Sequence, residues 1–351
     1  YWRDWSSDVC SSDLALEAKR REALDALFSR PNAWEKLEAI ALRAEAPTQI
    51  GWALSTYGSV DALDTMLEWL GSESAAPRDA AAAWVRSHLA VDGPADLRRA
   101  LERSDISSES LKRFVLNIPT SSRFWTVLRE FPSAHNLYWT ETPFEVVPSE
   151  DVTEAVESLL DRSRAWSAII VASHGIASLS MDHNKHRPAS ALVLSALRAA
   201  MTQDPFISEL PRMIGHQIGI LLDYLATAGV EVTELAWLEF GYFRLLEHSR
   251  EPRALNQTLA SDPALFVDLV RRAFRGSDGL RSQSESADPL TEHAWWVLRD
   301  WTGYPGRQED GTLDEAQMRE WVSKARFELA ELDRSDIGDE LIGGTFAHAP
   351  A

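Results

Sequence analysis

Cysteine is almost absent from this chain, and so are the sequence motifs of the well-marked enzyme classes. The 351 residues include a single cysteine, Cys10. The sequence contains no G-x-x-x-x-G-K-[ST], G-x-G-x-x-G, G-x-S-x-G or H-E-x-x-H motif. These absences exclude the recognisable P-loop NTPases, dinucleotide-binding enzymes, serine hydrolases and zinc proteases, although an enzyme of another kind remains open. No apolar run reaches the roughly 18 to 20 residues that a membrane span needs.

An excess of positive charge is also missing. The chain has 35 Lys and Arg against 54 Asp and Glu, which gives a formal net charge of −19. Such acidity repels nucleic acids and anionic lipids. The local basic candidates are Arg271, Arg272, Arg275 and Arg281, which we interpret as a solvated helix face. We therefore predict neither a nucleic-acid partner nor a membrane partner.

The first residues do not read as natural protein. Residues 1–14 are YWRDWSSDVCSSDL, and residues 4–14 resemble the translation of a common sequencing adapter. We expect 1–14 to be a non-native scar and the chain to be a fragment of a longer protein. Cys10 lies in this segment, so the native part has no cysteine and no disulfide chemistry. The absence of disulfides favours a cytoplasmic protein.

The rest of the chain has a helical rhythm. Helix patterns of about 10 to 15 residues alternate with short polar turns, and period-2 alternation is missing. The nearest approach to a strand is residues 143–148, PFEVVP, which prolines bound on both sides. We predict an all-α fold, built as an irregular α-solenoid-like array of antiparallel helix pairs similar to HEAT or TPR repeats.

The domain boundaries follow shifts in composition. The stretch 206–276 is the most apolar, and we predict that its segment 234–248 is one buried helix. Two caps are expected from local sequence: Ser107 before a helix, and Thr312 with Glu315 as a capping box. The predicted segments are the scar at 1–14, an N-terminal helical array at 15–132, a central helical region at 133–277, a linker with one Trp-rich helix at 278–312, and a C-terminal helical segment at 313–351.

One cluster of histidines is a candidate metal site. Its possible ligands are His174, Asp182, His183 and His186. Lys185 and Arg187 lie in the same turn and oppose a cation, and no cysteine can contribute. We therefore interpret the cluster as a solvated loop between helices and expect no cofactor.

Three polar residues within apolar helices are candidate catalytic groups: His216, Asp223 and Glu239. A polar residue in a core helix usually has a hydrogen-bonding partner or lies at the rim of the core. Perturbed acids nevertheless mark active sites. A helical enzyme or small-ligand-binding domain with a site near these residues is therefore the alternative hypothesis.

The segments LEFGYFRLLE (238–247), LASDPALFVDLVRRAFR (259–275) and the region from PGRQEDGT (305) onward carry a family resemblance. Residues 130–351 resemble the C-terminal helical region of large multi-domain bacterial proteins. Some of those proteins carry an N-terminal nucleotide-binding module of the STAND type and are linked to defence. The resemblance implies a sensor or scaffold arm, with any NTPase upstream of residue 15, and it transfers no catalytic residue. Our main hypothesis is a non-enzymatic scaffold that binds a protein or peptide, with the oligomeric state left open.

Overall fold

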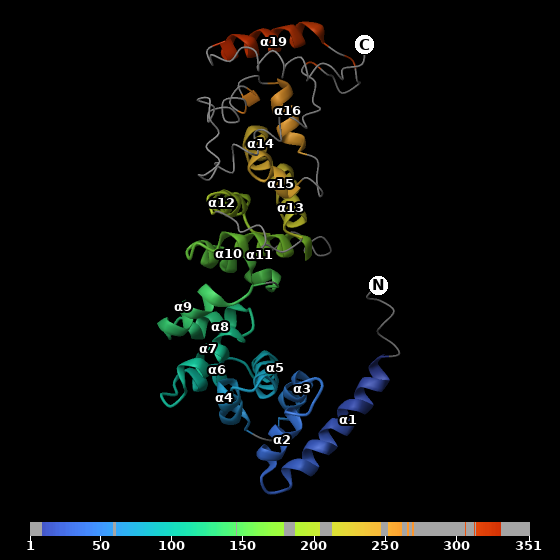
Figure 1. Ribbon diagram of the computed structural model, residues 1–351, viewed down its shortest axis with the longest axis vertical. Coiled ribbons are helices and arrows are strands. Elements are labelled where there is room, and N and C mark those ends of the chain that lie inside the picture. The colour runs from blue at the N-terminus through green and yellow to red at the C-terminus, as the bar shows by residue number, and fades with distance from the viewer. Residues whose placement is uncertain are drawn as a thin grey trace, which may run out of the picture. The chain divides into compact units, whose positions relative to one another are not determined.

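The described part of the chain is helical throughout. The computed structural model describes residues 9–58, 61–144, 146–178, 187–203, 213–246, 252–261, 265–266, 269, 306, 312 and 314–330. Within these ranges every regular element is a helix and no strand is present, which confirms the predicted all-α class. The chain divides into two compact units, residues 1–162 and 163–351 (Figure 1). The division lies inside the segment that we predicted as the central helical region.

The first unit contains ten α-helices and one short 3-10 helix among its described residues. They are α1 (Val9–Phe28), α2 (Ala33–Ala41), α3 (Pro47–Tyr57), α4 (Leu63–Gly71), α5 (Ala75–Asp92), α6 (Pro94–Leu101), α7 (Ser108–Leu116), α8 (Ser122–Leu128), α9 (Pro132–Glu141), η1 (Ser149–Asp151) and α10 (Val152–Leu160). Helices pack against their neighbours and also against the next helix but one. Examples are α3 with α5, α6 with α8, and α7 with α9.

The closest helix contact in this unit is between α3 and α5. A Cβ atom built on Gly51 of α3 would lie 1.8 Å from the carbonyl oxygen of Ala80 and 2.8 Å from the backbone nitrogen of Trp84, both in α5. Only a glycine fits at such a distance. Ala80 and Ala81 are fully buried, so small side chains on α5 complete the close approach. This contact fixes the position of α3, which forms one wall of the groove described below.

An aromatic cluster forms the core around α8 and α9. Trp125 and Trp139 lie with their ring centroids 4.9 Å apart, and Phe144 stacks on Trp139 at 4.9 Å. The indole N–H of Trp125 donates to the Tyr138 hydroxyl at 3.1 Å. All four side chains are buried. Both tryptophans therefore serve as core residues.

The described part of the second unit contains α11 (Ala165–Ser178), α12 (Ser190–Met201), α13 (Ile214–Thr227), α14 (Val232–Gly241), α15 (Phe243–Leu246), α16 (Arg253–Ser261) and α19 (Glu315–Ala330). Helix α11 packs against α12 and α13, and α14 packs against α16. The side chain of Trp321 in α19 is buried against Phe266. Its indole N–H donates to the carbonyl oxygen of Leu259 at 3.0 Å, which links α19 to the end of α16.

Two local predictions in this unit are wrong. The segment 234–248 is not one helix, because α14 ends at Gly241 and the separate helix α15 begins at Phe243. Tyr242 lies between them, and its buried hydroxyl donates to the carbonyl oxygen of Leu197 at 2.6 Å. Because this hydrogen bond joins residues far apart in the sequence, the apolar periodicity of 234–248 does not indicate it.

The predicted capping box at the start of α19 is also wrong in its residue. Helix α19 begins at Glu315, and the side chain of Asp314, the residue before it, accepts from the backbone N–H groups of Ala316 and Gln317 at 2.9 and 3.0 Å. An aspartate immediately before the first helical residue is a strong cap. The cap at α7 is confirmed, because the Ser107 hydroxyl accepts from the backbone N–H of Ser110 at 3.0 Å.

Several other predictions concern the linker, the basic residues and a possible strand. Most of the linker 278–312, and the basic candidates Arg271, Arg272, Arg275 and Arg281, lie outside the described residues. The described residues of the 143–148 segment form no strand. Among the helices that the structure describes, none combines the length and the apolar character needed to cross a membrane.

Candidate functional site

The three candidate catalytic residues lie in two different environments. His216 and Asp223 are on α13, and both side chains are exposed. They are seven residues apart, which is about two helical turns, so they share one face of the helix. Glu239 is on α14 and is fully buried. None of the three side chains lines the groove between α1, α2 and α3 that is described below.

The buried carboxyl group of Glu239 has a structural partner. Its Oε2 accepts from the backbone N–H of Leu255 at 2.8 Å. Leu255 is in the first turn of α16, where backbone N–H groups have no acceptor within the helix. An acidic side chain there also interacts favourably with the helix dipole. Glu239 therefore caps α16 from α14, and this contact accounts for a polar residue inside an apolar helix.

The candidate metal ligands are only partly described. His174 is half-buried on α11, and its Nε2 lies 3.2 Å from Nε2 of Gln217 on α13. Asp182, His183 and His186 lie outside the described residues. Within the ranges that the structure covers, no group of three His, Cys, Asp or Glu side chains could hold a metal ion. The placement of His174 against an amide side chain is that of a residue packed between two helices.

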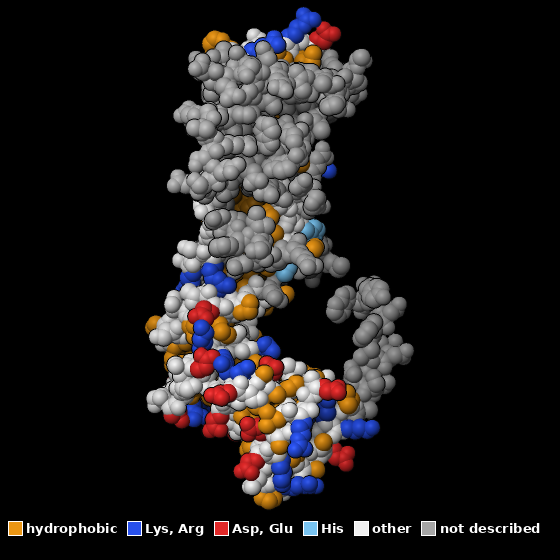
Figure 2. All heavy atoms as spheres, viewed as in Figure 1, with side chains coloured by type: hydrophobic (Ala, Val, Ile, Leu, Met, Phe, Trp, Pro, Cys, Tyr) orange, Lys and Arg blue, Asp and Glu red, His pale blue; other side chains and the backbone are white. Residues whose placement is uncertain are grey.

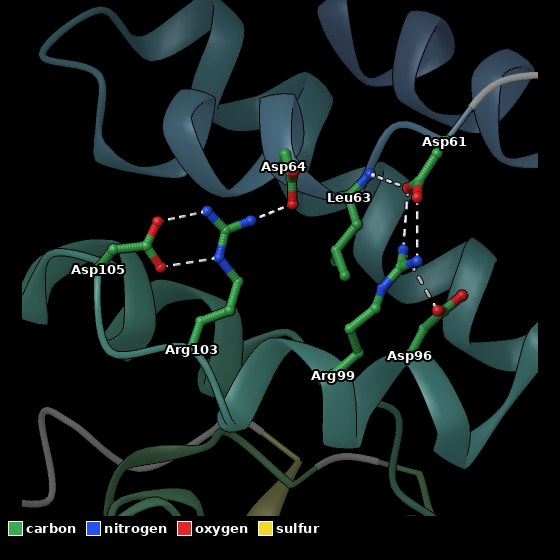
Figure 3. A network of polar contacts seen from close by, with 7 residues as sticks. All are labelled: Asp61, Leu63, Asp64, Asp96, Arg99, Arg103 and Asp105. Atoms are coloured by element: carbon green, nitrogen blue, oxygen red, sulfur yellow. Dashed lines mark hydrogen bonds and ion pairs between the residues drawn. The ribbon is translucent and has the colours of Figure 1, made fainter.

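A network of charged side chains joins α6 to α4 and to the segment before α4 (Figure 3). The Arg99 guanidinium donates to both carboxylate oxygens of Asp61, at 3.0 and 2.9 Å, and lies 3.4 Å from Asp96. Arg103 pairs in the same way with Asp105 and also with Asp64.

Hydrogen bonds within the network affect the pKa of two of its carboxyl groups, and the Arg103 side chain lowers the pKa of Asp105. Burial acts to raise the pKa of Asp61, but the hydrogen bonds from Arg99 and the Leu63 N–H outweigh it and lower that pKa. Each guanidinium is matched by carboxylates, and the side chains are partly exposed. Exposed ion pairs of this kind contribute little free energy. We therefore read this network as a surface contact that orients α6 on α4.

An open apolar groove is formed by α1, α2 and α3. Its volume is about 650 Å³. The apolar side chains of the groove come from all three helices: Ala23, Leu24 and Leu27 from α1, Leu37 and Ile40 from α2, and Ile50 and Ala53 from α3. Within each helix, residues three or four positions apart are represented. This spacing places each set on one side of its helix. We call this feature the α1–α3 groove.

The floor and the rim of the α1–α3 groove differ in exposure. Leu24 and Leu37 form a buried floor, with 8% and 3% of their surface exposed. Ile40 on the rim is 49% exposed. On the face shown in Figure 2, hydrophobic side chains are exposed among basic and acidic side chains over the α1–α3 region. The groove therefore leaves large apolar side chains exposed to solvent at its rim.

The polar side chains of the α1–α3 groove lie at its edges. Arg20 donates to Oε1 of Gln49 at 3.2 Å and lies over the ring of Trp52, 5.2 Å from its centroid. These two contacts hold Arg20 across the gap between α1 and α3. Arg30 follows the end of α1, and Glu45 follows α2; both are exposed. The polar groups therefore surround the apolar surface. Catalytic groups converge on one point of a pocket, and these side chains do not.

Sequence reasoning missed this groove. The buried residues of α2 are Ala33, Leu37 and Ala41, which follow one side of the helix. Ile40 and Leu42 do not belong to that row, and both are about half exposed. Large apolar residues outside the buried row of an amphipathic helix could have indicated an exposed apolar surface here.

Comparison with protein-family models, with curated proteins and with solved structures found no match for this chain. The function proposed below is therefore argued from the geometry of the described residues.

Proposed function

We propose that this chain is a non-enzymatic protein-interaction scaffold, acting as the helical arm of a larger bacterial protein. The observation that supports the proposal is the α1–α3 groove, an open apolar surface of about 650 Å³ bordered by charged side chains. Grooves between helices are a recurrent mode of binding an apolar helix face from a partner. The packing of several helices against the next but one, such as α3 on α5 and α11 on α13, is also expected of stacked helix pairs.

The placement of the candidate catalytic residues is consistent with this proposal. Glu239 accepts a hydrogen bond at a helix start, while His216 and Asp223 point to solvent from α13. An active site requires an acid, a base or a nucleophile within hydrogen-bonding reach of one another or of a substrate atom. These three side chains lie in different surroundings, and an assigned structural contact already explains Glu239.

The test compares two large aliphatic side chains in and next to α2. Ile40 lines the groove, whereas Leu42, the residue that follows the end of α2, does not. Both side chains are about half exposed, so an aspartate at either position is tolerated in the fold. We expect Ile40→Asp to abolish capture of protein partners from a bacterial lysate, and Leu42→Asp to preserve it. Circular dichroism melting curves establish that both variants are folded.

The proposal fails if Ile40→Asp and Leu42→Asp retain the same proteins as the unmodified chain, or if none of the three chains retains any protein. It also fails if a small metabolite raises the melting temperature of the unmodified chain and has no such effect on a folded Glu239→Gln variant. That result would support the ligand-binding alternative.

A further inference from the structure

The α1–α3 groove differs in charge from the chain that contains it. The whole chain has 54 acidic and 35 Lys or Arg residues. The side chains that line the groove include two arginines, Arg20 and Arg30, and one acid, Glu45. The lining is therefore net positive within a strongly acidic protein. Charge complementarity determines which partners associate productively.

The shape of the groove favours a helix as its occupant. Arg20 lies on α1, Arg30 follows two residues after its end, and the helical stretch from Arg20 to Phe28 rises about 12 Å. The wall between them carries the small side chains Ala23 and Ala26, both exposed. Small residues let the backbone of a second helix approach closely, and the neighbouring Leu27 and Ile40 offer apolar surface to its side chains. A length of about 12 Å accommodates about two helical turns, enough for apolar side chains at i, i+4 and i+7.

We propose, building on the interaction function above, that the α1–α3 groove binds an acidic amphipathic helix of a partner protein. The apolar face of that helix, with large residues at i, i+4 and i+7, packs on Leu24, Leu37 and Ile40. Carboxylates near its two ends pair with Arg20 and Arg30. Arg20 is already held by Gln49 and Trp52, so little side-chain freedom is lost when it pairs.

The probes are two fluorescein-labelled helical peptides of about 16 residues, roughly 24 Å when helical. Both carry leucines at i, i+4 and i+7, and their polar positions are glutamate in one peptide and lysine in the other. Anisotropy titrations of the full chain give the dissociation constant of each. The net charge of −19 attracts the lysine peptide non-specifically, so tighter binding of the glutamate peptide identifies local recognition.

Charge reversal in the groove provides the decisive comparison. In the double variant Arg20→Glu and Arg30→Glu, we expect the ratio of affinities for the glutamate and lysine peptides to fall roughly tenfold or more. The matched control is Lys19→Glu with Lys36→Glu. It makes the same charge change at exposed positions of α1 and α2 that do not line the groove, and it should leave the ratio within about twofold.

The remaining outcomes separate this inference from the function on which it rests. If the two peptides bind equally, or the lysine peptide binds more tightly, the acidic-helix inference is overturned. The interaction function then survives if Ile40→Asp still abolishes partner capture. If sedimentation shows a dimer that Ile40→Asp dissociates, a second copy of this chain is the occupant and the inference is overturned. If neither peptide binds and Ile40→Asp has no effect on capture, both proposals fail.

Discussion

Replacing Gly51 with alanine tests the closest helix contact in the protein. The added Cβ would lie 1.8 Å from the Ala80 carbonyl oxygen, and real Cβ atoms essentially never come within 3.0 Å of another heavy atom. Helices α3 and α5 must therefore move apart locally by about 1.2 Å, the difference between these two distances. The atoms met are backbone atoms of α5, so rotation of a side chain cannot relieve the clash.

The magnitude follows from two opposing effects. Alanine in place of glycine inside a helix stabilises that helix by about 1 kcal/mol. Overpacking a buried contact costs about 1–3 kcal/mol, and more where rigid groups meet. Separation of α3 from α5 also loosens the packing of the buried Leu54 and Trp84. We expect a net destabilisation of about 2 kcal/mol or more, which lowers the melting temperature by about 4–8 °C for a unit of this size.

Thermal and urea unfolding, followed by circular dichroism, measure the effect. Gly71→Ala in α4 is the matched control, because there the added Cβ would meet the Ser110 hydroxyl at 2.5 Å, which is the end of a side chain that can rotate. That variant should remain within about 1 kcal/mol of the unmodified chain. A Gly51→Ala protein as stable as the unmodified chain would refute the close packing of α3 on α5, and with it the wall of the groove.

Three further changes probe other contacts. Glu239→Ala should destabilise the fold by about 3 kcal/mol, because it removes the cap of α16 and leaves a cavity. Glu239→Gln keeps a hydrogen-bond acceptor and should cost about 1 kcal/mol. Equal urea midpoints for the two variants would contradict the capping role. Tyr242→Phe removes the hydrogen bond to Leu197 and should cost about 1 kcal/mol in the same assay, and an unchanged midpoint would exclude that bond. Burial, followed by the nearby Arg162 and Arg129 side chains, lowers the pKa of His135 below its ordinary 6.5. Its stabilisation is therefore complete above pH 6.5 and decreases as the pH falls below that value, so melting temperatures measured from pH 7.5 to 5 should fall less steeply for His135→Gln.

The indole contact of His135 gives that pH dependence a structural basis. Nε2 of His135 accepts from the indole N–H of Trp139 at 3.1 Å. A proton on Nε2 would break this hydrogen bond and place a cation beside the Arg162 guanidinium, which lies 3.5 Å from Nδ1. Nothing in the local sequence around His135 indicates that Arg162 lies beside it.

Local sequence rules predicted the features that depend on a few neighbouring residues. The all-α class follows from helical periodicity and from short turns, and the Ser107 cap follows from a serine three residues before an unpaired N–H group. The same rules placed one helix over 234–248, because the apolar pattern continues through Tyr242. The chain breaks there in the structure, where the Tyr242 hydroxyl bonds to another helix. The solenoid-like arrangement of the helices stays a prediction.

The sequence alone therefore determined the helical class, the acidic net charge and the Ser107 cap, because periodicity, composition and caps depend on a few neighbouring residues or on residue counts. Tertiary structure decided the role of Glu239, which depends on the start of α16 sixteen residues away. It also decided the α1–α3 groove, which requires three helices to leave Ile40 uncovered while Leu24 and Leu37 are buried. Which apolar side chains remain exposed depends on how helices pack, and no pattern within one helix contains that information.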